Sequence, residues 1–129
     1  MKSQNPIRKS TAFRNYFLGI YAEKWVMIIL WLNGYKIIRH RYKNHYGEID
    51  IIALKKGLII FCEVKASFKR VNIEKVLTVY QINRIKKCAQ AFLGQYPALQ
   101  KRRQRFDFIE VQALFWLILK IKHRTNFIS

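Results

Sequence analysis

The hydrophobic pattern is dominated by two apolar, β-branched runs, residues 49–54 and 58–64, which are separated by three residues. Runs of this length around a short polar break predict a β-hairpin. We expect Lys56 and Gly57 to be the central residues of its turn, with Gly57 supplying a positive φ. The hairpin is therefore the first element that the sequence predicts.

This turn fixes which residues of the two strands face each other. With Lys56 and Gly57 at the centre of the turn, the residue numbers of each facing pair add up to 113. Asp50 then faces Glu63, and Glu48 faces Lys65. Because side chains alternate along a strand, all four are expected on one face of the hairpin.

Helical patterns lie on both sides of the hairpin. Residues 14–33 contain no strong breaker, and Asn33 and Gly34 form a typical helix end. Its apolar residues lie nearly all round, so this helix should be buried on more than one side. A second helix should begin at Thr78, because Thr78-x-x-Gln81 fits a capping box and apolar residues follow at helical spacing.

The remaining segments complete a single predicted domain. Residues 1–12 are polar and basic and indicate a loose N-terminal arm, while residues 13–129 are long enough for one domain with one core. We expect a strand over 35–42, a mobile loop over 66–75, a strand over 105–111, and a continued or second strand over 111–122.

Charge changes this picture more than any other property of the composition. The 129 residues include 25 Lys and Arg against 7 Asp and Glu, which gives a formal net charge of +18 and a pI near 10.3. Such a chain should bind a polyanion, and nucleic acid is the leading candidate. We expect no membrane association and a cytoplasmic location, because no apolar run approaches the roughly 20 residues of a spanning helix and no signal-peptide core is present.

Three of the seven acids, Glu48, Asp50 and Glu63, lie in the hairpin. Facing carboxylates destabilise a strand pair unless something lies between them. A hard divalent cation is the natural candidate, because Mg²⁺ is often held by only one or two protein carboxylates. Lys65 would add a positive charge that holds phosphate or stabilises an attacking hydroxide.

Two further polar residues have both a structural and a functional interpretation. Glu23 lies on a helix face of small and apolar residues, where a buried carboxylate needs a partner; it is either an ion-paired residue or part of the site. Gln81 is either a capping-box residue or a side chain that orients water or phosphate. His40 and His45 are expected in solvated or hydrogen-bonding roles, and Cys62 and Cys88 as buried thiols.

Basic residues before and after the hairpin are candidate contacts to the nucleic-acid backbone. They follow the first predicted strand, the polar face of the second predicted helix, and the dense cluster in residues 100–105. Such contacts are salt-dependent and independent of sequence. The candidates are Arg39, Arg41, Lys43, Lys86, Lys87, Lys101, Arg102 and Arg103.

The motif Gly47-Glu48-Ile49-Asp50 followed by Glu63-Val64-Lys65 resembles the GExD and ExK signature of the PD-(D/E)XK nuclease superfamily. Across residues 19–123 the ordered motifs resemble the uncharacterised bacterial YraN family more narrowly. The resemblance implies a restriction-endonuclease-like α/β fold, with a mixed central sheet flanked by helices and an αβββαβ core. Family members commonly carry a lysine where this chain has Gln81.

The resemblance also implies a Mg²⁺ or Mn²⁺ site on Asp50 and Glu63, with Lys65 beside it and Glu23 as an additional ligand, as in Holliday junction resolvases of similar fold. Our leading hypothesis is a metal-dependent endonuclease acting on DNA, especially branched or structured DNA, in which Glu48 supports the site. A homodimer would supply the two active sites that a resolvase needs. The alternative is a nucleic-acid-binding protein that keeps the fold without cutting.

Overall fold

The computed structural model describes residues 6–68, 77–114 and 117–126, with side chains of the first helix described from Arg14 onward. The elements, in chain order, are α1 (Pro6–Leu32), β1 (Lys36–Asn44), β2 (Gly47–Lys55), β3 (Leu58–Ser67), α3 (Val79–Gln95), a short 3₁₀ helix (Pro97–Leu99), β4 (Arg103–Leu114) and β5 (Leu117–Arg124). The predicted order of helix, three strands, helix and strand is confirmed, and the continued or second strand expected over 111–122 is a separate strand, β5, that begins at Leu117.

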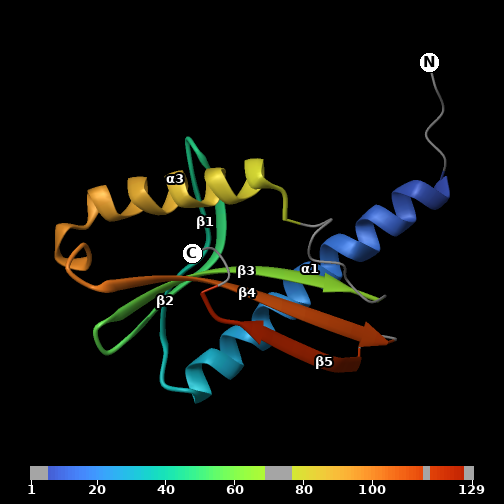
Figure 1. Cartoon of the computed structure of the whole chain (residues 1–129). Coiled ribbons are helices and arrows are strands. Elements are labelled where there is room, and N and C mark those ends of the chain that lie inside the picture. Colours follow the sequence, from blue (N-terminus) through green and yellow to red (C-terminus); the bar gives the residue numbers. More distant parts are fainter. Residues whose placement is uncertain (1–5, 69–76, 115–116, 127–129) are drawn as a thin grey trace.

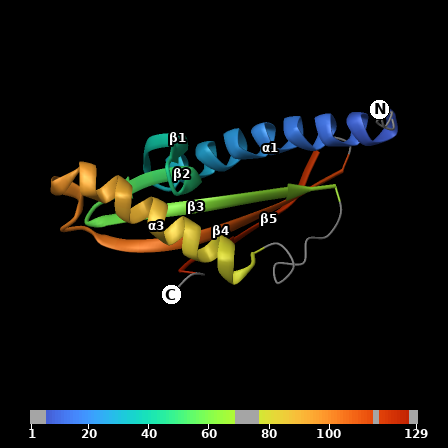
Figure 2. The same cartoon turned by 90° about the horizontal axis from the view of Figure 1, so that it is seen from above.

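The strands form one five-stranded sheet in the order β1-β2-β3-β4-β5. β3 and β4 are parallel, and the other neighbouring strands are antiparallel. The parallel pair requires a crossover, which α3 provides. The two helices cover opposite faces of this mixed sheet (Figure 1, Figure 2), and the restriction-endonuclease-like α/β fold is confirmed.

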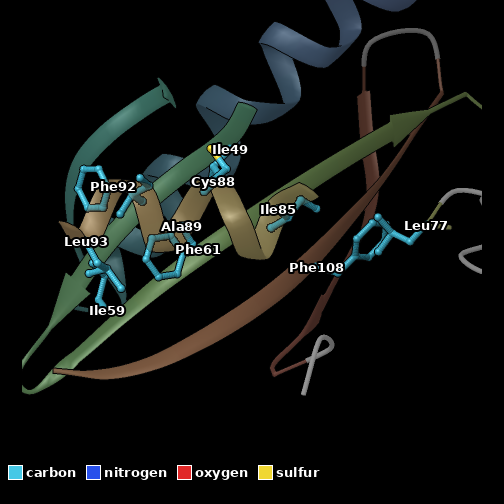
Figure 3. Close-up of a cluster of buried hydrophobic side chains, with 11 residues drawn as sticks. Ile49, Ile59, Phe61, Leu77, Ile85, Cys88, Ala89, Phe92, Leu93 and Phe108 are labelled. Atoms are coloured by element: carbon cyan, nitrogen blue, oxygen red, sulfur yellow. The ribbon is translucent and has the colours of Figure 1, made fainter. Parts of the chain in front are cut away.

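Alternation along the central strands divides the core between the two faces. Ile52, Ile59 and Phe61 pack with α3 residues such as Phe92. These side chains fill the space between α3 and the sheet (Figure 3), where the Phe61 and Phe92 ring centroids are 6.3 Å apart. On the other face, α1 packs its small and branched side chains on the alternate positions of the same strands, namely Ala22, Val26 and Leu30 on Ile51, Ala53 and Ile60.

The predicted hairpin register is confirmed over the paired part of the two strands, whereas the predicted pairs of Asp50 with Glu63 and Glu48 with Lys65 lie beyond the last ladder pair and stay a prediction. Pairing runs from Lys55 and Leu58 to Ile51 and Cys62, and each pair sums to 113. The turn itself differs from the prediction, because the positive φ of 53° belongs to Lys56 and not to Gly57. Lys56 is exposed, so its side chain extends into solvent while its backbone takes the left-handed conformation.

The N-terminal helix begins earlier than expected. We expected a loose arm over 1–12, yet α1 starts at Pro6, so residues 6–12 continue the helix. Proline is compatible with a first helical turn, because the N–H that it lacks has no partner there. Residues 1–5 lie outside the described part of the chain.

The other local expectations are mostly met. The predicted mobile loop over 66–75 is shorter at its start, because β3 continues to Ser67; residues 69–76 lie outside the described part. Cys62 and Cys88 are both buried free thiols, as predicted. Among the described residues, no helix combines the length and hydropathy of a membrane-spanning segment.

Candidate metal centre

A small cavity opens where β2 and β3 meet the beginning of α3. Its volume is about 140 Å³. Glu63 and Lys65 reach it because they share a strand face with Phe61, which packs toward α3. The full lining is Gly47, Glu48, Glu63, Lys65, Leu77, Gln81, Arg84 and Ile85.

Asp50 lies next to this cavity, at the point where the hairpin ladder ends. The last recorded pair of β2 and β3 is Ile51 with Cys62, and Asp50 is one residue beyond it. Its Oδ2 accepts a hydrogen bond of 2.7 Å from the backbone N–H of Val64. The carboxylate therefore bridges the two strands in place of the next ladder bond, beside Glu63.

The two acids lie in an environment that disfavours their charged forms. Burial, followed by the charge of Asp50, raises the pKa of Glu63 to about 8. Burial is also the main cause that raises the pKa of Asp50 to about 6, although the Val64 N–H acts in the opposite direction. In addition, Oε1 of Glu63 is buried without a hydrogen-bond partner. The positive charge of Lys65 lowers both pKa values but does not offset burial, and the oxygen donors of the pair fit a hard divalent cation.

Glu23 approaches the same region from α1 on the opposite side of the sheet. It is only 5% exposed. Its Oε2 accepts a hydrogen bond of 3.0 Å from Nε of Arg41 and lies 3.0 Å from Nε2 of His40. Its negative charge contributes to the raised pKa of Asp50. The partner that the buried glutamate required is thus Arg41 with His40.

No group of three His, Cys, Asp or Glu side chains within the described ranges is arranged to hold a metal ion. The arrangement presents Asp50 and Glu63 as a pair, with Glu23 engaged by two basic side chains. The role of Glu23 as an additional ligand therefore stays a prediction.

Comparison with known proteins places this site within a family. The family model described as "Uncharacterised protein family UPF0102" matches residues 22–111. The chain belongs to UPF0102. This confirms the resemblance to the YraN family and to the PD-(D/E)XK nuclease superfamily.

Individual UPF0102 proteins are similar over most of the chain. A UPF0102 protein of Acinetobacter baylyi is 41% identical over 98 residues, which cover 73% of this chain and 69% of that protein. One from Bradyrhizobium sp. ORS 278 is 38% identical over 85% of this chain and 75% of its own length. One from Bartonella bacilliformis is 33% identical over 107 residues, which cover 81% of this chain and 86% of that protein.

In this UPF0102 chain Gln81 is a capping residue. Its Oε1 accepts a hydrogen bond of 3.1 Å from the Thr78 N–H, and its own N–H donates to Thr78 Oγ1 at 3.2 Å. The predicted capping box is confirmed. Because Gln81 also lines the cavity, its contact with water or phosphate stays a prediction.

The candidate basic residues of β1 are used within the protein. Arg39 donates a hydrogen bond of 2.6 Å to the Tyr96 hydroxyl beyond α3. Arg41 instead turns to Glu23, on the α1 side of the sheet. We expected both at outward phosphate-binding positions, but a positive φ of 55° at Arg41 interrupts the alternation and separates them. Lys43 is exposed and lies opposite Glu48 in the β1 and β2 ladder.

The other candidates lie on α3 and at the start of β4. Lys87, Lys101 and Arg103 are exposed, Lys86 is half-buried, and Arg102 donates a hydrogen bond to the Lys56 carbonyl. In the parallel pair of β3 and β4, Arg103 lies opposite Leu58, and Phe108 lies opposite Glu63. Arg103, the last residue of the basic cluster 101–103, is therefore five residues from Glu63 along the strands. Five residues correspond to roughly 16 Å at the rise of a strand. At this separation the basic cluster and the acid pair can contact the same nucleic-acid backbone.

Sequence reasoning missed Arg84. This residue lines the cavity one helical turn after Gln81, and its Nε donates a hydrogen bond of 3.0 Å to the Tyr46 carbonyl. The i, i+3 spacing from Gln81 is the one signal that could have identified it. A larger cavity of about 810 Å³ between α1 and β1 has a mainly apolar lining that includes Trp31 and Ile37, and no carboxylate.

Proposed function

We propose that this UPF0102 protein is a Mg²⁺- or Mn²⁺-dependent endonuclease that hydrolyses phosphodiester bonds in DNA, with branched or structured DNA as the favoured substrate. The observation that carries the proposal is the half-buried pair of Asp50 and Glu63, because one carboxylate oxygen of Glu63 is buried without a hydrogen-bond partner. Burying such a pair costs free energy without a compensating cation.

Asp50 and Glu63 would hold the metal ion, which would lower the pKa of a bound water and neutralise charge on the phosphate. Asp50 is positioned for this by the Val64 N–H, which holds its carboxylate beside Glu63. Lys65 lines the same cavity two residues after Glu63 and would stabilise negative charge that develops on the scissile phosphate. Glu48, from the facing strand, would balance the charge of Lys65.

The net charge of +18 supports a polyanionic substrate. Exposed basic side chains contribute contacts to phosphate that position a nucleic acid without reading its sequence. Lys43 lies near the cavity and Lys101 and Arg103 lie further along the strands, so one backbone would be contacted at separate points.

The second candidate is a nucleic-acid-binding protein that does not cut. The engagement of Glu23 by Arg41 and His40 favours it, because a glutamate in these ion pairs is less available as an additional metal ligand. Both candidates predict salt-sensitive DNA binding. They differ in metal binding and turnover.

The test is a cleavage assay on forked, four-way, single-stranded and duplex DNA with Mg²⁺, Mn²⁺ or EDTA. Asp50→Asn, purified in parallel, is the key variant, because asparagine retains an oxygen that can accept the Val64 N–H. We expect metal-dependent cutting by the wild type and at least a hundredfold loss in the variant. Cutting that survives Asp50→Asn would show a contaminating nuclease. Absence of both cutting and calorimetric metal binding, with DNA binding retained, would support the second candidate.

A further inference from the structure

Two exposed tyrosines directly precede Gly47 and Gln81, which line the cavity that contains Glu63 and Lys65. Tyr46 lies in the turn between β1 and β2 and is 45% exposed, and Tyr80 lies in the first turn of α3 and is 70% exposed. These rings come from segments more than thirty residues apart in the chain. Large aromatic rings left in solvent beside a candidate site indicate a ligand surface more often than scattered exposed residues do.

Arg84 connects the two tyrosines with the cavity. Its Nε donates to the Tyr46 carbonyl at 3.0 Å, its guanidinium carbon lies 5.7 Å from the centre of the Tyr80 ring, and its side chain lines the cavity. The Nε–H uses one of the five guanidinium donors, so the group is oriented while most of its donors point elsewhere. An arginine held this way is suited to phosphate.

Aromatic side chains distinguish unpaired from paired nucleotides. In a duplex the bases are stacked on one another, whereas an unpaired base exposes a face that can stack on an aromatic ring. Stacking tolerates any base, and a neighbouring arginine can bind the connecting phosphate. A basic protein with this arrangement favours single strands over duplex.

We propose that Tyr46, Tyr80 and Arg84 form a binding site for unpaired nucleotides next to the acid pair. Tyr46 and Tyr80 stack on bases, and Arg84 binds the phosphate between them. The site thus directs single-stranded segments, such as flaps and the open strands of branched DNA, toward Asp50 and Glu63. Only this last step rests on the proposed endonuclease function; binding does not.

Binding is therefore measured in EDTA, where no cutting interferes. Fluorescence anisotropy compares a labelled single-stranded oligonucleotide with a duplex of the same length, for wild type, Tyr46→Ala, Tyr80→Ala and the double variant. We expect each single variant to bind the single strand about fivefold or more weakly. Duplex binding should change less than twofold.

Trp31→Ala is the matched control, because Trp31 is an exposed aromatic residue of α1 that lies outside this cavity. It should leave both affinities unchanged. Tyr80→Phe keeps the ring and should retain single-strand binding, which separates stacking from any loss of folding. Arg84→Ala should weaken single-strand binding and reduce its salt dependence.

The proposal is overturned if the double variant binds single strand as the wild type does, if both DNA forms weaken equally, or if Trp31→Ala has the same effect. Failure of the endonuclease proposal gives a different result, because a protein that never cuts would still show the tyrosine-dependent preference in EDTA. Conversely, cutting that depends on Asp50 but not on the tyrosines would refute this inference alone.

Discussion

Asp50 accepts a 2.7 Å hydrogen bond from the backbone N–H of Val64, the residue that follows Glu63. The bond lies one step beyond the last paired residues of the hairpin. Because it attaches a β2 side chain to the β3 backbone, the Asp50 carboxylate is held near Glu63 whether or not a cation is bound. The repulsion between the carboxylates of Asp50 and Glu63 is therefore a property of the fold.

Glu63→Gln should stabilise the metal-free protein at pH 8. The folded pKa of Glu63, about 8, lies above its ordinary value of 4.5, so its contribution to stability is fully present below about pH 4.5 and is lost as the pH rises through 8. Removing this group should raise the free energy of unfolding at pH 8 by roughly 1–3 kcal/mol relative to wild type. Urea unfolding in EDTA at pH 5 and pH 8 measures the difference. Mg²⁺ should stabilise only the wild type, and identical pH dependence in both proteins would contradict the interpretation.

Glu23→Gln should act mainly on stability. The substitution leaves Arg41 and His40 without the carboxylate that they share, and we expect a loss of about 1–2 kcal/mol from a partly buried ion pair. Mg²⁺ affinity should fall less than tenfold, whereas Asp50→Asn should abolish it. Calorimetric titration with Mg²⁺ measures the affinity of both variants. If Glu23→Gln loses as much Mg²⁺ affinity as Asp50→Asn does, Glu23 is a metal ligand.

The two roles of Gln81 are separable by substitution. Thr78→Ala removes one half of the capping box and should cost about 1 kcal/mol. Gln81→Glu keeps an acceptor for the Thr78 N–H and adds a negative charge at the helix N-terminus, so stability should change by less than about 0.5 kcal/mol. Chemical denaturation measures both. If Gln81→Glu folds normally but binds DNA or metal differently, the residue acts in the cavity as well as in the cap.

The buried acid Asp107 should protect the fold against acid. Its carboxylate accepts hydrogen bonds from Arg105 at 2.8 Å and from the Asn126 N–H at 2.9 Å, and lies 2.7 Å from His123 Nε2. Burial opposes ionisation, but hydrogen bonds from His123 and Arg105 outweigh it and lower the Asp107 pKa to about 2.

Stability from Asp107 is therefore present above about pH 3.8 and is lost as the pH falls through 2. Asp107→Asn should cost about 2 kcal/mol at pH 7, and the difference from wild type should shrink toward pH 2. Thermal melts across this range test it. A constant difference at every pH would show that packing, rather than charge, is responsible.

The basic cluster at the start of β4 should affect DNA affinity without changing sequence preference. Lys101→Ala and Arg103→Ala remove exposed positive charges, and each should reduce the slope of log affinity against log salt by about 1. Lys120→Ala, an exposed residue of the edge strand β5, is the control. If all three reduce the slope alike, binding follows net charge rather than this cluster.

Local patterns determined much of the architecture. The apolar, β-branched runs of residues 49–54 and 58–64 predicted a hairpin whose register holds from Lys55 and Leu58 to Ile51 and Cys62. The spacing of Thr78 and Gln81 predicted the capping box at the start of α3. These features depend on residues close in sequence, where spacing decides which side chains meet.

The tertiary structure decided which side chains surround the candidate site. Packing of α1 and α3 on opposite faces brought Arg41 to Glu23 and Arg84 to Tyr46, contacts that span 18 and 38 residues. Positive φ values at Lys56 and Arg41 changed the expected turn and the expected direction of a basic side chain. The sequence by itself determined the hairpin that brings Asp50 and Glu63 together. Only the fold decided their neighbours, because burial and long-range contacts depend on how the helices pack, which local periodicity does not encode.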